Sequence, residues 1–520
     1  MEKRVLAAAL LSAIFLAGYS QLISRWYGSK AVRPVQPAAR PDAAISAAPQ
    51  IHGQATTLQH FVDEEVIFIE SQHLRLEIGT LTGTVRRAVL KTFQSSSSNS
   101  PLEFGGPVPI LSCQIGSREL KWTIINSTPN TATFNAVDSE NNNYHISYRI
   151  DDQNPVLNAQ LSSEQPTQHD AEVTLVSSWT RGDDMNGRNN PLEAILITDA
   201  GQGKTKREHR IFPLKKEQIV PRGTLFATLS ERYFCSSLRP KDGKFGIRLI
   251  PATNGTAALS ATTSPPSDQD GRWSVAADLY LGPRDYFYLR RANFSSAIPV
   301  GWLGQIGLIF LLVLKWLGTI TGNYGVAVIL FSVLVSLFTA PFTLVSLKSM
   351  KKMQELKPQI DRLTAAHKGD PTRANKEIFG LYKQHKVNPM SGCLPMLLQM
   401  PILIALFQAI SHFIELRGKP FLWIRDLSLP DRLAQLPVSL PILGGDLNIL
   451  PVIMAVAMYV QTKMSQGKMA ADQSNPTAKM MSGPTMSIVF GVMFYQFPSG
   501  LVLYWLTNSL LSLAWYRLAK

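Results

Sequence analysis

The chain has 520 residues, of which 45% are hydrophobic and 17% are charged, and its formal net charge at pH 7 is +14. The mean hydropathy of +0.03 is ordinary for a soluble protein, but the apolar residues are gathered into long runs. Charged residues are absent from four stretches: 324–346, 393–414, 447–462 and 482–516. These runs exclude a single soluble domain and predict membrane spans. Three cysteines are too few for a disulfide framework, and whether Cys113 and Cys235 pair stays open.

Residues 1–25 have the charge layout of a signal peptide or of an uncleaved anchor. Lys3 and Arg4 precede an apolar stretch that runs to about residue 23, and we favour a transmembrane anchor. Residues 26–57 are rich in Pro and Ala and have few side chains able to build a core. We interpret them as a semi-rigid linker.

Residues 58–299 show a hydrophobic period of two, as at Leu74, Leu76 and Ile78, with Gly, Pro and Asn between the runs. This pattern predicts a large antiparallel β-sandwich domain. The histidines have no metal-ligand spacing, and we find no nucleophile elbow or phosphate loop. The one Ser-x-x-Lys match, at 349–352, lies in a Lys-rich helix without its companion motifs, which favours chance over catalysis.

Residues 300–323 contain an ambiguous apolar stretch at 303–318. Its 16 residues would reach about 24 Å as a helix, short of a hydrocarbon core of ~30 Å. The charges of the loops decide between a span and an interfacial helix. Residues 347–392 carry ten Lys and Arg against four Asp and Glu, a net charge of +6, whereas 413–446 has four of each. A single span at 324–346 leaves the +6 loop in the cytoplasm, so we interpret 303–318 as an interfacial helix.

The remaining spans are predicted at 393–414, 447–462, 482–496 and 501–516, with an outer turn at 497–500. Together with the anchor and the span at 324–346 they make six, with both termini in the cytoplasm. The expected fold is therefore a polytopic α-helical membrane bundle, consisting of an N-terminal anchor and a core of five spans at 324–520, with a large exported β domain.

The basic loop at 347–392 is predicted to form a helical hairpin, because its apolar residues recur at intervals of three and four. Asp370 is a suitable N-cap and Pro371 a suitable first-turn residue for the second helix, with Gly369 in the turn. From charge alone, a purely topogenic loop and a docking surface are equally good interpretations.

Polar residues recur inside the apolar spans. Ser332, Ser336, Thr339 and Thr343 are spaced by four, three and four, which places four hydroxyls on one helix face. Trp505, Asn508, Ser509 and Ser512 make a similar stripe in the last span, and Gln399 lies between two prolines. Hydroxyls can also bond to carbonyls of their own helix. Three polar sets with no acidic residue in any span favour a wet cavity over an ion or proton pathway.

Several stretches resemble the YidC/Oxa/Alb family of membrane protein insertases. They are "NPMSGCLPMLLQMPILIALF", "FPSGLVLYWLTN", "SMKKMQELKPQIDRL", "LSERYFCSSL" and "LYLGPRDY". The resemblance covers most of the chain and implies the Gram-negative type, in which the exported domain is a β-supersandwich in the periplasm. It also implies a multi-pass protein of the bacterial inner membrane, with no enzymatic activity, cofactor or metal.

The resemblance implies a hydrophilic groove that accepts nascent membrane proteins, alone or with the Sec translocon. The groove residues carried over are Ser332, Ser336, Thr339, Gln399, Trp505 and Asn508. The hairpin would contact incoming chains, the ribosome or signal recognition components through Lys348, Lys351, Lys352, Lys357 and Arg362. One position departs from the family: Ser336 stands where its members usually have a groove arginine.

Two other functions fit parts of the sequence. A polytopic transporter or channel is the main alternative, which the lack of charged residues in the spans and of an inverted repeat disfavours. An exported sugar-processing enzyme on a membrane anchor is the second, because the supersandwich resembles carbohydrate-active folds.

Overall fold

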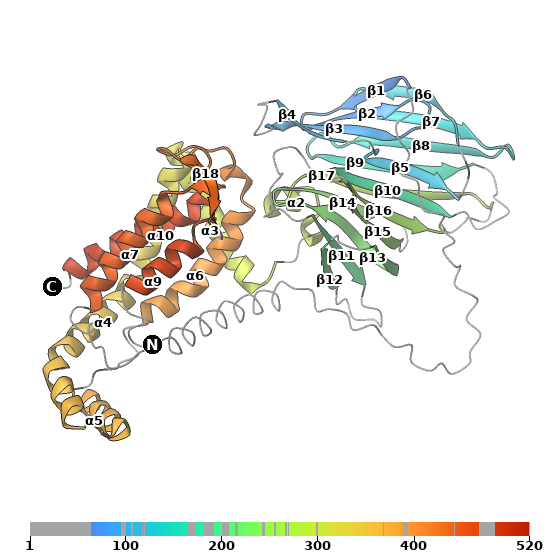
Figure 1. Ribbon diagram of the computed structural model, residues 1–520. Helices are drawn as coiled ribbons and strands as arrows, with labels where there is room; N and C mark the ends of the chain where they lie inside the picture. Colours follow the sequence, from blue (N-terminus) through green and yellow to red (C-terminus); the bar gives the residue numbers. More distant parts are fainter. Residues whose placement is uncertain are drawn as a thin grey trace, which may run out of the picture. The chain divides into compact units, whose positions relative to one another are not determined.

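The computed structural model describes residues 64–518 except 95–99, 106–107, 117, 119, 165–171, 181–191, 200–206, 214–216, 242–244, 254–255, 266–267, 269, 298–299, 368, 386, 388–393, 441–442 and 467–483. The chain divides into two compact units, Met1–Pro299 and Val300–Lys520 (Figure 1). The predicted anchor at 1–25 and linker at 26–57 lie outside the described residues.

The described part of the first unit is built mainly of β-strands that pair antiparallel in one hydrogen-bonded network. Its strands are β1 (Val66–Glu70), β2 (Leu74–Gly79), β3 (Val85–Gln94), β4 (Pro101–Phe104), β5 (Leu111–Ile115), β6 (Trp122–Thr128), β7 (Thr131–Val137), β8 (Asn143–Ile150), β9 (Val156–Ser163), β10 (Val173–Thr180), β11 (Glu193–Asp199), β12 (Arg207–Pro213), β13 (Gln218–Ser230), β14 (Phe234–Pro240), β15 (Phe245–Thr253), β16 (Thr256–Thr263) and β17 (Trp273–Pro283).

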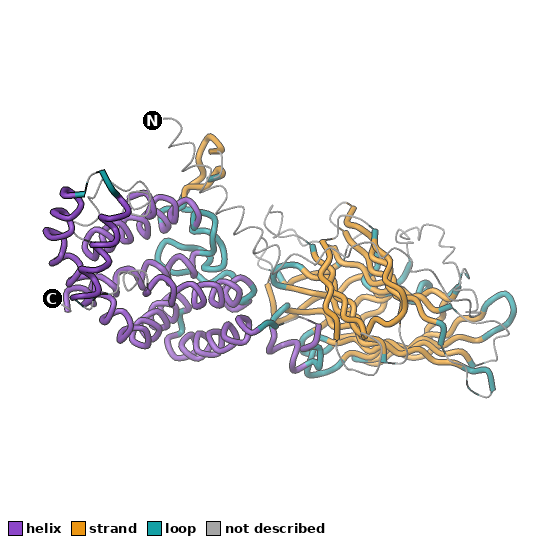
Figure 2. Tube along the Cα trace, turned by 90° about the horizontal axis from the view of Figure 1, so that it is seen from below, coloured by secondary structure: helices purple, strands orange, loops and turns teal. Residues whose placement is uncertain are grey.

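Burial along the strands confirms the predicted period of two. In β7 and β8 buried residues alternate with more exposed ones, because one face of each strand packs on the core. Strands β14 and β16 are buried at almost every position, so both of their faces are covered. Half-covered and fully covered strands together make a large β-sandwich-like domain, which holds most of the strands drawn in orange in Figure 2.

The two motifs of this domain have structural roles. In "LSERYFCSSL" the buried Glu231 accepts a hydrogen bond from Trp179 Nε1 at 3.0 Å. In "LYLGPRDY" Asp285 caps α2 (Tyr286–Arg291) by accepting from the backbone N–H of Phe287 at 2.9 Å. Helix α2 and the 3-10 turn η2 (Ser295–Ala297) then close one part of the core.

Cys113 on β5 and Cys235 on β14 are not joined in a disulfide. Cys235 is fully buried, and burial raises the pKa of its thiol to about 12. The pairing that the sequence left open is therefore not made, and Cys235 belongs to the apolar core.

The second unit is built mainly of helices. Its elements are α3 (Trp302–Thr321), α4 (Tyr324–Ala366), α5 (Pro371–Gln384), α6 (Leu394–Ser411), the 3-10 turn η4 (Ile414–Leu416), the hairpin strands β18 (Ala434–Leu440) and β19 (Gly444–Leu447), α7 (Leu450–Gln466), α9 (Pro484–Met493) and α10 (Ser499–Leu518). Helix α10 packs against α4 and α7, and α3 packs against α4 and α6.

Helix α4 contains both the span predicted at 324–346 and the first helix of the hairpin predicted at 347–392. It runs unbroken for 43 residues, so the apolar segment and the first hairpin helix are one rod. Asn323 begins it by accepting from the backbone N–H of Gly325 at 2.8 Å. Pro341 and Pro358 lie inside the helix and remove one backbone donor each without ending it.

The distal half of α4 and helix α5 form the predicted hairpin. Met353, Leu356 and Ile360 are buried, and they form a small core with Ile378, Leu381 and Tyr382. Asp370 caps α5 as expected, accepting from Thr372 and Arg373 N–H at 3.1 and 3.0 Å, with Pro371 in the first turn. The hairpin thus has its own core, as the three-four periodicity predicted.

Helix α3 is longer than the stretch 303–318. Its 20 residues reach about 30 Å, so length does not argue against a span. By length and composition, α3 and α4 are the two described helices able to cross a membrane. The loop charges remain the argument for an interfacial α3. One face packs closely on α6, where a Cβ on Gly307 would lie 3.0 Å from the Ala405 carbonyl, while Trp316 is 60% exposed.

The other predicted spans correspond to α6, α7, α9 and α10, with shifted ends. The described part of α9 ends at Met493, before the predicted end of that span at 496. The predicted turn at 497–500 is shorter, because α10 begins at Ser499. The hairpin β18–β19 between α6 and α7 was not predicted.

Gly325 offers a test of packing at the start of α4. A Cβ there would lie 2.1 Å from Phe421 Cγ, so Gly325→Ala should destabilise the helical unit by about 1–3 kcal/mol through overpacking. Gly380→Ala in α5 is the matched control, because nothing lies within 4 Å of its Cβ and alanine favours helix. Thermal unfolding in detergent should show a lower midpoint for Gly325→Ala alone; equal midpoints would contradict this packing.

Candidate hydrophilic groove

The predicted polar face of α4 lies inside the helical unit. Ser332, Ser336 and Thr339 are 0%, 4% and 8% exposed. Ser332 Oγ donates to the Val328 carbonyl at 2.7 Å, and Thr339 Oγ1 donates to the Val335 carbonyl at 3.0 Å. These two hydroxyls therefore bond to carbonyls of their own helix, as hydroxyls in helices can do, and these bonds join α4 to no other described helix.

Ser336 makes a contact of a different kind, because its partner is on another helix. Trp515 Nε1 of α10 donates to Ser336 Oγ at 2.9 Å. A tryptophan indole can only donate, so the serine oxygen is the acceptor. The position where the resemblance implies an arginine therefore holds a neutral hydrogen-bonded pair, in which Ser336 is buried and Trp515 half-buried.

Gln399 also reaches α10. Its Nε2 donates to the hydroxyl oxygen of Tyr504 at 2.5 Å, and Tyr504 is fully buried. The Tyr504 ring lies 6.1 Å from the ring of Phe331 on α4, measured between centroids. Helices α4, α6 and α10 thus converge on Tyr504, beside the apolar residue that precedes Ser332.

Trp505 lies on a different side of α10. Its Nε1 donates to Met458 Sδ on α7 at 3.1 Å. Its ring packs on Phe490 of α9 and on Phe494, just after α9, at 5.5 and 5.4 Å between centroids. The structure therefore does not bring Trp505 together with Ser336 and Gln399. The half-buried Asn508 shares the face of Tyr504 and Trp515, since steps of four and eleven return to nearly the same helix angle.

Tyr504 and Trp515 are the polar-tipped residues that the sequence reasoning missed. Both are aromatic residues within an apolar run, so the hydropathy pattern alone does not distinguish them from residues that pack without polar contacts. Their spacing with Asn508, at four and then seven residues, is a helical periodicity that could have revealed them. The sequence does not specify that this face of α10 bonds to Ser336 and Gln399.

The basic residues of the hairpin lie outside its apolar core. Lys348, Lys351, Lys352 and Arg362 are exposed, and Lys357 is half-buried. Their surface is separate from the buried polar pairs of α4, α6 and α10. The hairpin and the groove are two candidate sites on one helix.

The groove residues can donate and accept hydrogen bonds but carry no charge. Within the described ranges, no group of three or more His, Cys, Asp or Glu could hold a metal ion. Amide, indole and hydroxyl groups do not titrate near neutral pH, so they are suited to replacing water around a polar segment rather than to acid–base chemistry.

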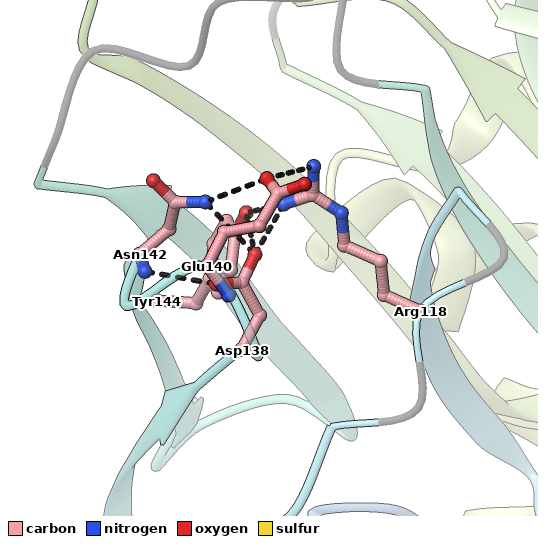
Figure 3. Close-up of polar contacts among 5 residues, drawn as sticks. All are labelled: Arg118, Asp138, Glu140, Asn142 and Tyr144. Atoms are coloured by element: carbon pink, nitrogen blue, oxygen red, sulfur yellow. Dashed lines mark hydrogen bonds and ion pairs between the residues drawn. The ribbon is translucent and has the colours of Figure 1, made fainter.

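The β domain also contains a polar cluster, shown in Figure 3. Asp138 directly follows β7. Its Oδ2 contacts Arg118, and its Oδ1 accepts from the backbone N–H of Asn142 at 2.9 Å. Arg118 also forms an ion pair with Glu140 at 3.0 Å. Tyr144 donates to Asp138 at 3.2 Å. Burial opposes ionisation of Asp138, but hydrogen bonds from Asn142 and Glu140 and the charge of Arg118 hold its pKa below the usual value. These groups bind each other and stabilise the β7–β8 turn.

Tyr504→Phe would test the Gln399–Tyr504 bond. The substitution removes the acceptor of a partly buried amide N–H, which should lower the stability of the helical unit by about 1–3 kcal/mol. Tyr459→Phe is the matched control, because Tyr459 on α7 is more than a third exposed. Midpoints of thermal unfolding in detergent should separate the two variants, and equal values would show that the bond contributes nothing.

Comparisons with known proteins show which proteins the chain is similar to. Residues 316–518 match the family model described as 60Kd inner membrane protein. The chain is 39% identical over 307 residues to the membrane protein insertase YidC of Syntrophobacter fumaroxidans, covering 58% of this chain and 54% of that protein. It is 32% identical over 373 residues to the YidC of Geotalea uraniireducens, covering 71% and 65%. The matched segments thus span about half to two thirds of these relatives.

A solved structure of an active YidC insertase, with its first transmembrane domain resolved, is also similar. It is 18% identical, with a TM-score of 0.37, over 88% of this chain and 93% of that one. The comparisons give the transporter alternative no support. They confirm the resemblance found in the sequence motifs: the chain is similar to the YidC membrane protein insertases.

Proposed function

We propose that the chain is a membrane protein insertase and chaperone, which inserts and folds integral membrane proteins through a hydrophilic groove, alone or with the Sec translocon. The names of its relatives support this function. The observation that carries it is the convergence of polar side chains from α4, α6 and α10 inside an apolar helical unit. Nascent membrane proteins are the proposed substrates, and no catalytic residue or cofactor takes part.

The mechanism is replacement of solvent. A polar flank of a client loses its hydration in the bilayer, which costs several kcal/mol for each unpaired group. Donors such as Gln399 and the Trp515–Ser336 pair, together with admitted water, would bind this flank, while the client's apolar segment leaves toward lipid. The free-energy barrier to moving the polar flank across the bilayer is thereby lowered, without a site that hydrolyses a nucleotide.

The groove is closed in this structure, since Ser332, Ser336 and Tyr504 are buried. Insertion therefore needs α10 to separate from α4 and α6. Among the described residues, the bonds that must break include two contacts between neutral groups, Gln399–Tyr504 and Trp515–Ser336. A neutral hydrogen bond contributes only about 0.5–1.5 kcal/mol net, so opening requires little energy at these positions.

The length of one predicted span supports the same function. The span predicted at 482–496 has 15 residues, which would reach about 22 Å as a helix, short of a hydrocarbon core of ~30 Å. A short apolar segment favours local thinning of the bilayer. Thinning would shorten the distance that a client's polar flank crosses.

The proposed location is the bacterial inner membrane, with the β domain in the periplasm and both termini in the cytoplasm. The net charge of +6 at 347–392, against zero at 413–446, supports this orientation. It puts the hairpin in the cytoplasm and the β18–β19 loop outside. Helix α3 is then an interfacial helix on the outer side, held to η4 by the Lys315–Glu415 ion pair at 2.5 Å.

The hairpin is the proposed contact for the ribosome, signal recognition components and incoming chains. Its Lys and Arg side chains point away from the apolar core, which suits attraction to anionic partners. Because α4 is continuous, a partner bound at the hairpin holds the same helix that carries Ser336.

Removing the donors together tests the insertase function. The triple variant Ser336→Ala, Gln399→Leu and Asn508→Leu should slow insertion of a model client by about tenfold or more, since three hydrogen-bonding groups are lost. The measurement is the rate of protease protection of the client's translocated tail in reconstituted vesicles. Ser336→Ala alone should have a small effect.

Thr319→Ala, Thr321→Ala and Thr364→Ala together make the matched control, because these hydroxyls bond within or beside their own helices outside the groove. Equal rates for the two triple variants would remove the groove from the mechanism. Wild-type vesicles no faster than protein-free vesicles would overturn the insertase function itself.

Cysteine labelling tests the orientation. A cysteine at Gly369 in the hairpin turn should resist a membrane-impermeant maleimide added to intact spheroplasts, whereas one at exposed Arg432 should react. Both sites lie in loops next to ordered elements, so labelling reports the side of the membrane. Reaction at position 369 from outside would reverse the topology and restore α3 as a span.

A further inference from the structure

Trp515 is not among the residues that the family resemblance brings to the groove, yet it makes the cross-helix contact at the position of the missing arginine. Its indole N–H donates to Ser336 Oγ at 2.9 Å. Ser336 is almost fully buried on α4, and Trp515 belongs to the last turns of α10. The two residues are 179 positions apart and meet only through the packing of these helices.

This contact differs from those of the neighbouring hydroxyls. Ser332 and Thr339 are bonded to carbonyls of α4 itself, and such bonds persist when α4 and α10 separate. The Trp515–Ser336 bond cannot persist, because its two atoms belong to different helices. Separation therefore exposes one indole N–H and one hydroxyl that need new partners.

We propose that Trp515 is a specificity-determining residue of the groove, whose indole N–H binds uncharged acceptor oxygens, backbone and amide carbonyls, in the translocated flank of a client. The inference rests on the proposed insertase function. When a client enters, a carbonyl oxygen takes the place of Ser336 Oγ on the indole, and the freed Ser336 hydroxyl serves as a second donor or acceptor.

The selectivity follows from charge. A neutral carbonyl that accepts a hydrogen bond from an N–H donor is almost as stable as one that accepts from water, so its transfer from water into the groove costs little free energy. A carboxylate loses far more hydration, and a neutral donor does not restore it as a cation would. A groove with Trp515 and Ser336 therefore favours neutral polar tails over acidic ones.

The contact with Trp515 also bears on whether an arginine could be accommodated at position 336. The side chain of Ser336 is buried under the indole that contacts it, so the longer arginine side chain needs the space that Trp515 occupies. We expect Ser336→Arg alone to insert acidic-tailed clients poorly, and Ser336→Arg with Trp515→Ala to insert them better. The identities of residues 336 and 515 are coupled through this contact.

The test uses two clients whose translocated tails differ only in Asn against Asp, inserted into vesicles that contain the full chain. Trp515→Phe keeps the ring and removes the N–H. It should slow the Asn-tailed client by about fivefold, which is about 1 kcal/mol, and change the Asp-tailed client little. Trp515→His, which keeps a ring N–H, should recover part of the loss. Trp316→Phe, at an exposed site on α3, is the matched control.

The outcomes separate this inference from the proposed function. Wild-type vesicles that insert neither client overturn the insertase function. If wild type inserts both and Trp515→Phe matches it, or slows both clients in equal proportion, the indole N–H is not a recognition group and the inference is wrong. The thermal midpoint of each variant is measured together with the rates. If the bond is purely structural, its loss in Trp515→Phe lowers the midpoint and slows both clients together.

Discussion

Every polar group inside an apolar helical unit must find a partner within the protein, and this requirement organises the second half of the chain. Ser332 and Thr339 meet it on their own helix, whereas Gln399, Tyr504, Ser336 and Trp515 meet it between helices. The first kind of bond is indifferent to how the helices pack. The second holds α10 against α4 and α6, and it is lost when they separate. The same contacts thus stabilise the closed unit and supply the donors that an open groove would use.

The continuity of α4 links the two candidate sites. One helix of 43 residues carries the buried polar face near its start and the basic hairpin surface near its end. A rigid rod transmits rotation or tilt along its length, although Pro341, between the two sites, removes one backbone hydrogen bond and is the point where a bend costs least. A partner that binds the hairpin can therefore influence the contact between Ser336 and Trp515 without touching it.

The β domain contributes neither charged nor polar groups to the groove contacts described above. Its two family motifs bury Glu231 and cap α2 with Asp285, and its Arg118–Asp138 cluster is engaged in a turn. These groups have partners within the domain, so they account for its stability rather than for chemistry. The proposal that the chain is an insertase therefore depends on the helical unit.

The sequence by itself determined the elements whose residues interact locally. A period of two marked the strands, charge-free runs marked the apolar helices, and Asp370 with Pro371 marked the start of α5, because alternation, hydropathy and capping act over a few neighbouring residues. It also indicated the family through contiguous motifs. Only the tertiary structure decided that α4 continues past residue 346, that α3 has 20 residues, and that Trp505 faces α7 while Tyr504 and Trp515 face α4 and α6. The facing of α10 depends on contacts between residues 47 to 179 positions apart, such as Gln399 with Tyr504, and no local pattern specifies which helix a polar face will meet.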